Sequence, residues 1–401
     1  MAKKYLTSSA YIQVRPTDQL PEGATSPDAK PTISFVPQKK GKPPAHLVDF
    51  PMSERKKYAK EQGFKPFRID QLSRHYFSHY TADVEQMTDF NRVEGQKLVN
   101  TFLPKLITPI RALSADKGKT VKHLWEMYDG ARVESVLMGY KDRTTLCISS
   151  QAGCGMGCPF CATGQMGLTR NLSTAEIIEQ VRLANLACKN GELPGSDRVT
   201  NIVFMGMGEP MANYKNLIQS LHSLIDEPPH GFGMSARNIT VSTVGLVPAI
   251  NKLAAEKIPV TLAVSLHAPD DDLRDELIPI NSRFKVGQLL DAARNYFEVT
   301  GRRVSIEYAL IKNMNDHAFR AQLLADELNK RGKGWAHVNP IPLNPTPGSI
   351  WTATEPDVQE LFVKTLRNNG ISTTIRDTRG SDIDGACGQL AAEVLQQERK
   401  A

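Results

Sequence analysis

From about residue 144 onward, short apolar runs alternate with longer segments whose apolar residues follow helical spacing. The short runs predict β-strands and the longer segments predict α-helices. This alternation predicts a mostly parallel sheet with helical crossovers. About six such units favour an open, partial (β/α)6 barrel over the closed eight-unit form. Strands are expected at 144–149, 201–205, 239–242, 260–266, 304–310, 337–341 and 372–376, and helices at 174–189, 214–225, 248–255, 286–297, 316–330 and 357–369.

Different patterns precede this barrel. Strands expected at 121–128 and 132–139 flank Asp129-Gly130, a strong hairpin signal, and Glu134 lies in the second of them. Further upstream, helices are expected near 53–63, 68–80 and 96–102. The expected organisation is a disordered, basic, Pro-rich tail at 1–46, a small helical RNA-binding domain at 47–115, the barrel with its hairpin at 116–395, and a short tail at 396–401.

The composition is that of a soluble globular protein, with 40% hydrophobic and 23% charged residues in a chain of 401. No run of about 18 apolar residues predicts a membrane span. The N-terminus lacks the apolar stretch of a secretory signal. Six cysteines, three of them close together, do not resemble a secreted disulfide framework. We therefore expect a cytoplasmic protein.

The net charge of +6 is unevenly distributed along the chain. Residues 1–112 contain 18 Lys and Arg against 11 Asp and Glu, whereas the rest contains 31 against 32. A basic region of this kind favours a polyanionic partner, most simply a nucleic acid. Charge alone is equally compatible with a solvated basic face that binds nothing specific.

Three cysteines with the spacing C-x3-C-x2-C, namely Cys154, Cys158 and Cys161, carry the strongest chemical signal. A structural zinc site would need a fourth ligand, and none follows at finger-like spacing. Cys thiolates also hold four-iron clusters. Three protein ligands would leave one iron open to a small chelating ligand, which suits chemistry rather than electron storage. The alternatives are a zinc site with a distant ligand, or three inert buried thiols.

Small polar residues and glycines follow the other predicted strands. Because carboxyl ends of parallel strands collect the ligand sites in such folds, we expect these residues to share one mouth. Individually, each is more typical of a helix cap or a turn than of a ligand. They are Gly208 and Glu209 in Gly-Met-Gly-Glu-Pro, then Ser242, then Ser265, Leu266 and His267, and finally Asn344.

Two further cysteines lie outside the C-x3-C-x2-C motif. Cys147 ends the strand that leads into the motif, and Cys387 lies in Asp384-Gly-Ala-Cys-Gly, a loop flexible enough to reach over the barrel mouth. Two thiols near one reaction centre could form a transient disulfide. The alternative is that both are unrelated small hydrophobic residues.

Together these motifs resemble the RlmN family, radical S-adenosylmethionine (SAM) methyltransferases of dual specificity that act on adenine carbon 2 of 23S rRNA and of tRNA. The resemblance covers about residues 50 to 395. It rests on Cys147-Ile-Ser-Ser-Gln-Ala-Gly-Cys154, Cys158-Pro-Phe-Cys161, Gly-Met-Gly-Glu-Pro, Ser-Leu-His-Ala and Asp384-Gly-Ala-Cys-Gly-Gln-Leu.

The resemblance implies a [4Fe-4S] cluster on Cys154, Cys158 and Cys161, and two SAM molecules per turnover, one as methyl donor and one as radical source. It implies that Cys387 carries the methyl group, that Cys147 releases the product from a covalent RNA–protein intermediate, and that Glu134 removes the C2 proton. It further implies a monomer that receives electrons from a flavodoxin or ferredoxin. The SAM-binding residues would be Gly208, Glu209, Ser242, Ser265, Leu266, His267 and Asn344.

Two other functions stay open at this point. The sister family of Cfr enzymes methylates carbon 8 of the same adenine with the same cysteines, so the cysteines do not discriminate between the two positions. A non-catalytic RNA-binding protein with a structural zinc is an alternative of another class, but it assigns no role to Cys147 or Cys387.

Overall fold

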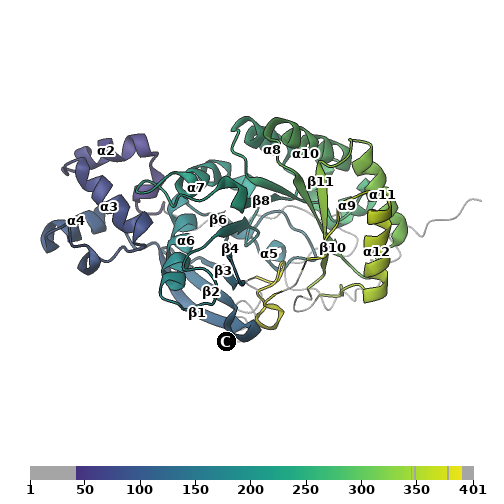
Figure 1. Cartoon of the computed structure of the whole chain (residues 1–401), viewed down its shortest axis with the longest axis horizontal. Helices are drawn as coiled ribbons and strands as arrows, with labels where there is room; N and C mark the ends of the chain where they lie inside the picture. Colours follow the sequence, from purple (N-terminus) through teal and green to yellow (C-terminus); the bar gives the residue numbers. More distant parts are fainter. Residues whose placement is uncertain (1–41, 345, 347–348, 377–378, 391–401) are drawn as a thin grey trace, which may run out of the picture.

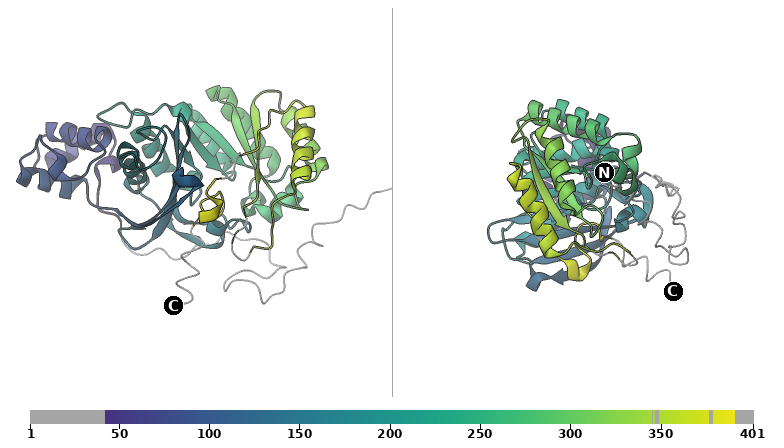
Figure 2. Two further views of the ribbon diagram at one scale, coloured as in Figure 1. Left: turned by 60° about the horizontal axis from the view of Figure 1, so that its bottom comes forward. Right: turned by 90° about the vertical axis from the view of Figure 1, so that its right-hand side faces the viewer.

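The computed structural model describes residues 42–344, 346, 349–376 and 379–390. A small helical region at one end of the molecule precedes an antiparallel ribbon, which continues into a parallel sheet with helices on its outside (Figures 1 and 2). Of the expected terminal tails, residues 1–41 and 396–401 lie outside the described residues. No helix within the described ranges has the length and apolar character that crossing a membrane requires.

Among the described residues, nine strands form the main sheet in the order β1-β2-β3-β4-β7-β8-β9-β10-β11. Every neighbouring pair from β4 to β11 is parallel. Six parallel strands joined by helices confirm the expected partial (β/α)6 barrel. These strands are β4 (Thr144–Cys147), β7 (Asn201–Phe204), β8 (Ile239–Thr243), β9 (Thr261–Ser265), β10 (Val304–Leu310) and β11 (Ala336–Pro342).

Helices on the outer face of the sheet connect these strands (Figure 1). Each packs through one apolar stripe, as on α7, where Leu217, Leu221 and Leu224 are fully buried. α6 begins with a capping box in which Ser173 and Glu176 satisfy each other's backbone N–H groups. The helices are α6 (Thr174–Lys189), α7 (Tyr214–Ile225), α8 (Val247–Ala255), α9 (Asp271–Leu277), α10 (Val286–Thr300), α11 (Ala318–Asn329) and α12 (Pro356–Asn368).

An antiparallel ribbon extends the barrel sheet through β3, which pairs with β4. Its strands are β1 (Ile107–Ala115), β2 (Thr120–Met127) and β3 (Arg132–Gly139). The expected turn at Asp129-Gly130 is present: Gly130 has a φ of +82° and the Asp129 carboxylate accepts from the Ala131 N–H. Residues 107–115 were expected to belong to the helical domain, and this expectation was wrong because they form β1. Its side chains are mostly exposed, so it lacks the apolar alternation that marks a strand.

Some segments between the motifs also differ from expectation. The cysteine segment forms its own two-stranded hairpin of β5 (Gln151–Cys154) and β6 (Gly167–Asn171), with the short helix α5 (Ala162–Gln165) between them. Residues 372–376 do not form a full strand. They run beside β11 with an isolated bridge from Thr373 to Val338, and the Arg376 N–H donates to the Pro340 carbonyl.

The N-terminal helices are α2 (Met52–Glu61), α3 (Phe67–Ser78) and α4 (Arg92–Phe102). α2 begins after Pro51 rather than at Ser53. α4 begins earlier than expected because Asn91, whose side chain accepts from the Glu94 N–H, is its N-cap. His46, at the end of the expected tail, is buried, so the folded region begins slightly before the predicted boundary.

Aromatic residues of α3 hold this helical region against the barrel. The Tyr76 hydroxyl donates to Glu179 on α6 at 2.7 Å, and Glu179 pairs with Arg182 at 2.7 Å. Phe77 packs edge-on against Phe232 with ring centroids 5.0 Å apart. Both aromatic side chains are buried, so they form core contacts and are not available to stack on bases.

One buried ion network connects three separate elements of the fold. Arg170 on β6 donates to Asp129 in the ribbon turn at 2.8 Å and to Glu176 at the start of α6 at 2.6 Å. The side chains are 7%, 8% and 0% exposed, respectively. Removing the cation from such a site leaves two buried carboxylates without their partner.

We predict that Arg170→Ala lowers the free energy of unfolding by about 3–5 kcal/mol, because two buried carboxylates lose their cation. The matched control is Arg294→Ala, which removes an (i, i+4) pair with Glu298 on the solvent side of α10 and should cost at most about 0.5 kcal/mol. Thermal unfolding followed by circular dichroism separates the two. Equal unfolding temperatures for both variants would show that the network does not stabilise the fold.

Candidate active site

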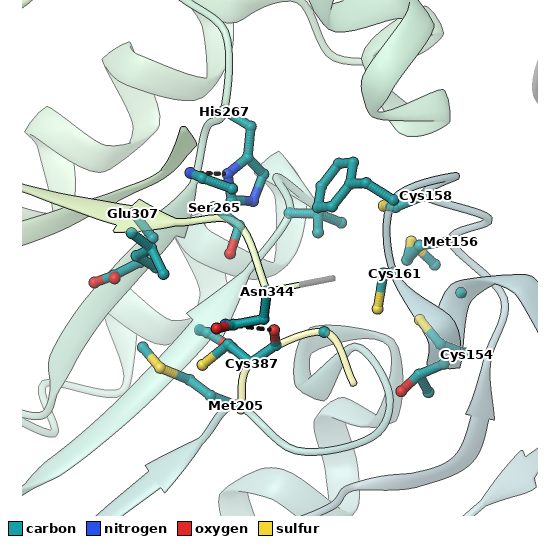
Figure 3. A pocket seen from close by; sticks show the side chains of 18 of the residues that line it. Cys154, Met156, Cys158, Cys161, Met205, Ser265, His267, Glu307, Asn344 and Cys387 are labelled. Atoms are coloured by element: carbon teal, nitrogen blue, oxygen red, sulfur yellow. Dashed lines mark hydrogen bonds between the residues drawn. The ribbon is translucent and has the colours of Figure 1, made fainter. Parts of the chain in front are cut away.

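A cavity of about 160 Å³ lies at the carboxyl ends of the barrel strands, and we call it the mouth cavity. Figure 3 shows Cys154, Cys158 and Cys161 on one side of it and Asn344 and Cys387 on the other. Ten of the residues singled out from the sequence line this one space, as the strand-end argument predicted. They are Cys154, Cys158, Cys161, Gly208, Glu209, Ser242, Ser265, His267, Asn344 and Cys387.

Two glycines set the path of the cysteine loop. Gly153 has a φ of +74°, and a Cβ there would lie 2.0 Å from the Gly167 carbonyl of the facing strand β6. A Cβ on Gly164 would lie 2.8 Å from the Cys158 carbonyl. Larger residues would therefore push the hairpin strands apart or displace the cysteine loop.

The three motif thiols are buried beside one another. Burial raises the pKa of Cys154 to about 12, and the nearby Cys161 adds to this shift. Burial and the charges of Cys154 and Cys161 also raise the pKa of Cys158 well above its usual value. Thiolates this close together need a cationic centre to keep them ionised.

Within the described ranges, no three His, Cys, Asp or Glu side chains converge as they would on a single metal ion. In an iron–sulfur cluster each thiolate binds an iron of its own, so the sulfurs surround a volume instead of meeting at one point. Phe160 and Met156 supply apolar lining beside Cys154, Cys158 and Cys161. The donor set and its surroundings therefore fit a cluster held by three cysteines.

Glu209 is held rigidly at the cavity wall. Its carboxylate accepts from the Met211 N–H at 3.0 Å and from the Val244 N–H at 2.9 Å. Burial raises its pKa to about 7. Gly208 precedes it with a φ of +100°, and a Cβ there would lie 2.4 Å from Cβ of Gln151. The arrangement presents a carboxylate to the cavity that would be stabilised by a cationic ligand group.

His267 faces the same cavity as a neutral ring. Burial lowers its pKa to about 3. Its Nδ1 accepts from the Ala309 N–H at 2.9 Å, which assigns the proton to Nε2. Phe160 packs edge-on against it at 5.2 Å. Leu266 differs from its neighbours because its side chain is fully buried and does not line the cavity.

The Cys387 loop lies across the mouth cavity through contacts with three parts of the chain. Asn344 Nδ2 donates to the Cys387 carbonyl at 3.3 Å. The Gly388 carbonyl accepts from the Ala162 N–H, directly after the last motif cysteine, at 2.8 Å. Lys122 Nζ on β2 donates to the Asp384 carbonyl at 3.3 Å. These bonds hold the Cys387 loop at the mouth cavity, and Figure 3 shows Asn344 next to Cys387 there.

A second cavity of about 500 Å³ adjoins the first, and Cys147 and Cys387 both line it. Thr145, Asn201 and Asn238, at the starts of β4, β7 and β8, also line it, so it runs along the barrel interior away from the mouth. The structure thus brings the two cysteines together at one space, with both thiols free. Burial and the charge of Cys387 raise the pKa of Cys147 to about 12.

We call this second space the arginine cavity, since Arg143, Arg237, Arg376 and Arg379 line it. The Tyr140 ring lies 4.2 Å from the guanidinium groups of both Arg143 and Arg379. Our reading of the sequence missed these residues, because the charge asymmetry pointed to residues 1–112 instead. It also missed Glu307 in the mouth cavity, although a charged residue within the apolar run 304–310 was an available signal.

Glu134 lies outside the lining of both cavities. It is buried on β3, and its carboxylate lies 3.5 Å from Lys122 Nζ, with both side chains almost fully enclosed. Its connection to the site is indirect, because Lys122 also binds the Asp384 carbonyl in the Cys387 loop.

Comparison with known families agrees with this geometry. The radical SAM superfamily profile matches residues 148–321, and the profile of the ribosomal RNA large subunit methyltransferase N-terminal domain matches residues 45–103. A crystal structure of a radical SAM methyltransferase from Sphaerobacter thermophilus superposes with a TM-score of 0.82 at 42% identity, covering 87% of this chain and all of that one.

Curated relatives match along most of their length. A protein of Kocuria rhizophila, named "Probable dual-specificity RNA methyltransferase RlmN", is 59% identical over 90% of this chain and 96% of its own. A protein of Bifidobacterium adolescentis with the same name is 55% identical over 94% of this chain and 98% of its own. Family profiles, relatives and fold all agree, and the chain belongs to the RlmN family of radical SAM methyltransferases.

Proposed function

We propose that this enzyme methylates carbon 2 of one adenine in 23S rRNA and of an adenine in tRNA. The observation that carries the proposal is the convergence of the cluster cysteines, the expected SAM-binding residues and the pair Cys387 and Cys147 on two adjoining cavities. The names of the relatives, which describe dual-specificity RNA methyltransferases, support the substrate class.

The residues of the mouth cavity fit the cofactors of the radical SAM family. Cys154, Cys158 and Cys161 would hold the [4Fe-4S] cluster, and Glu209 would accept from the ammonium group of SAM. When bound, this pair supplies the adenosyl radical that starts the reaction. Flavodoxin or ferredoxin is the electron donor we propose. The remaining SAM contacts would come from Gly208, Ser242, Ser265, His267, Asn344 and the backbone of Leu266.

Cys387 is the residue we propose to carry the methyl group. Adenine carbon 2 is electron-poor, so it cannot displace a methyl group from a sulfonium as a nucleophile. A thiolate can: the Cys387 sulfur forms the new bond to the methyl carbon, and the broken bond's electron pair returns to the sulfur of SAM. After the methyl group has given one hydrogen atom to the adenosyl radical, which becomes 5′-deoxyadenosine, the methylene radical on Cys387 adds to carbon 2. Cys387 fits this role because it lines both cavities.

Cys147 then releases the product in the proposed cycle. Before this step the radical adduct loses its C2 proton to the base and one electron, which the iron–sulfur cluster would take back. The Cys147 thiolate then attacks the Cys387 sulfur, the disulfide forms as the sulfur–carbon bond breaks, and the carbon keeps the electron pair and takes up a proton. Cys147 lines the arginine cavity together with Cys387, which supports this role.

Glu134 is the base we propose for the C2 proton. Its carboxylate is buried against Lys122. The adenine would therefore reach it only after a small movement of the β2–β3 ribbon or of the Cys387 loop. The shared partner supports this, because Lys122 binds both Glu134 and the loop that carries Cys387. A movement that withdraws the loop would therefore also change the environment of the base.

Nucleoside analysis is the direct test of the proposed reaction. Ribosomal RNA and tRNA are incubated with cluster-loaded enzyme, SAM and a reductant, then digested and analysed by mass spectrometry. 2-Methyladenosine is expected from both RNAs. 8-Methyladenosine would assign the chain to Cfr-type chemistry, and absence of product from tRNA would restrict the enzyme to ribosomal RNA.

For the cluster, we expect replacement of Cys154, Cys158 or Cys161 by Ala to abolish iron binding and SAM cleavage, since each thiolate binds one iron. Cys188→Ala is the matched control, because this buried thiol on α6 lines neither cavity. Iron and sulfide assays on the purified proteins provide the measurement. Full iron content in any of the three variants would remove that residue from the ligand set.

Replacing Cys387 should block the first step of the proposed cycle, and replacing Cys147 should block the last. Cys387→Ala should accept no methyl group and form no adduct. Cys147→Ala should accept the methyl group, add to RNA and then stall, because no thiolate attacks the Cys387 sulfur. A shifted band on a denaturing gel, sensitive to ribonuclease, should appear only with Cys147→Ala. Normal turnover in that variant would exclude Cys147 as the releasing residue.

The N-terminal region is proposed to position RNA through phosphate contacts. Deleting it would uncover the buried surface around Tyr76, so charge reversal is the cleaner change. We expect K57E/K60E/K65E, at exposed lysines, to weaken RNA binding more than tenfold and to reduce the salt slope by about two to three. The control K330E reverses a mostly exposed lysine just after α11. Equal RNA affinities measured for both variants would show that the basic N-terminal face does not bind RNA.

A further inference from the structure

Arg376 lies where the mouth cavity and the arginine cavity adjoin. Five of the described residues line both the mouth cavity and the arginine cavity, and Arg376 is the charged one among them; the others are Met205, Ile341, Asn344 and Cys387. The sequence motifs of the family did not single it out.

Several contacts fix the Arg376 side chain. Its backbone N–H donates to the Pro340 carbonyl at 2.9 Å, which ties this segment to β11. The guanidinium lies 3.2 Å from the Met205 sulfur and 3.5 Å from the Glu307 carboxylate on β10. Because β10 and β11 pair with each other over seven residues of the barrel sheet, the cation has a defined position between the cavities.

Glu307 holds Arg376 without neutralising it completely. One carboxylate oxygen accepts from Ser305 at 2.6 Å and from Asn339 at 3.1 Å. The other oxygen makes no hydrogen bond within the described structure and faces the guanidinium at the longer distance of 3.5 Å. Donors of the guanidinium are therefore left for other acceptors at the cavity junction.

Both functional thiols lie within the electrostatic reach of this cation. Negative charge at Cys387 raises the pKa of Arg376, and Glu307, Cys147 and Tyr140 add to the shift. Conversely, Arg376 works against the burial and the Cys387 charge that raise the pKa of Cys147. Cys161 of the cysteine loop also lies within electrostatic reach of Cys387.

We propose that Arg376 is a positioning residue that stabilises first the thiolate of Cys387 and then the thiolate of Cys147. The inference rests on the proposed function for its place in the cycle. In the first step, the anionic Cys387 sulfur accepts the methyl group of SAM and becomes a neutral thioether, while SAM leaves as the neutral thioether S-adenosylhomocysteine.

This charge change orders the use of the two cysteines. While Cys387 is anionic, its charge opposes ionisation of Cys147. Once methylated, Cys387 carries no charge, and Arg376 is left with Cys147 as its thiolate partner. The same guanidinium thus serves the two thiols in the order that the reaction requires.

Thiol labelling tests this proposal without RNA or SAM. Cluster-loaded enzyme is treated anaerobically with iodoacetamide across a range of pH, and the rate at each cysteine is read by peptide mass spectrometry. At neutral pH, Arg376→Gln should slow labelling of Cys387 by about tenfold, and the deficit should shrink as pH rises, because an opposite charge favours the ionised thiol by about that factor. Arg376→Lys, which keeps the charge, should restore most of the rate.

Arg379→Gln is the matched control. Arg379 lies three residues further along and lines the same arginine cavity, but it stacks on Tyr140 and donates to the Gly139 carbonyl. We expect it to change the labelling rate of Cys387 by less than about twofold. A loss in Arg376→Gln that is independent of pH, or that Arg376→Lys does not restore, would reduce Arg376 to a structural residue and overturn the proposal.

A second pair of variants tests the ordering. Cys387→Ala should increase labelling of Cys147 severalfold, because the opposing charge is gone, and adding Arg376→Gln should cancel this increase. Unchanged labelling of Cys147 in Cys387→Ala would overturn the ordering. Because the labelling requires no catalysis, a failure of C2 methylation in the nucleoside assay would refute the proposed reaction without altering these rates.

Discussion

Parallel pairing of six strands is the constraint on which the active site depends. Parallel strands all end at the same edge, so the residues after β4, β7, β8, β9 and β11 meet at one mouth even though the chain separates them widely. The Cys387 loop reaches the same place from the far end of the described chain, where bonds to Ala162 and Asn344 hold it. The sheet thus brings together groups that no local structure could hold in contact.

Burial at this mouth shifts the pKa values of the ionisable groups toward their neutral forms. The carboxyl of Glu209 has its pKa raised to about 7, the ring of His267 is neutral because its pKa falls to about 3, and the motif thiols resist ionisation. Ionising the carboxyl and the thiols in such a buried site costs free energy, and a bound cation offsets that cost. The core of the proposed iron–sulfur cluster and the sulfonium and ammonium groups of SAM would bring positive charge, beside the guanidinium of Arg376. The electrostatic environment therefore favours the proposed cofactors, in addition to the ligand geometry.

The regions on either side of the barrel are joined to it through buried contacts. The helical region is fixed to α6 by Tyr76, Glu179 and Arg182, so exposed lysines of α2 have a constant position relative to the cavities. The β1–β3 ribbon extends the sheet on the other side, and its Lys122 links Glu134 with the Cys387 loop. Buried contacts thus connect the helical region to the barrel, and the proposed base to the Cys387 loop.

The sequence alone determined those features that depend on local spacing. The C-x3-C-x2-C motif placed three thiols in one loop, the alternation of apolar runs and helical segments predicted the barrel strands, and Asp129-Gly130 predicted the ribbon turn. Only the tertiary structure decided that β1 joins the sheet, that Glu134 is buried against Lys122, and that Arg376 and Glu307 meet between two cavities. β1 is an edge strand with mostly exposed side chains, so its sequence lacks the alternation of apolar and polar residues that predicts a strand. Contacts between distant residues depend on strand register and loop path, which are set by the packing of the whole chain and not by any short stretch of it.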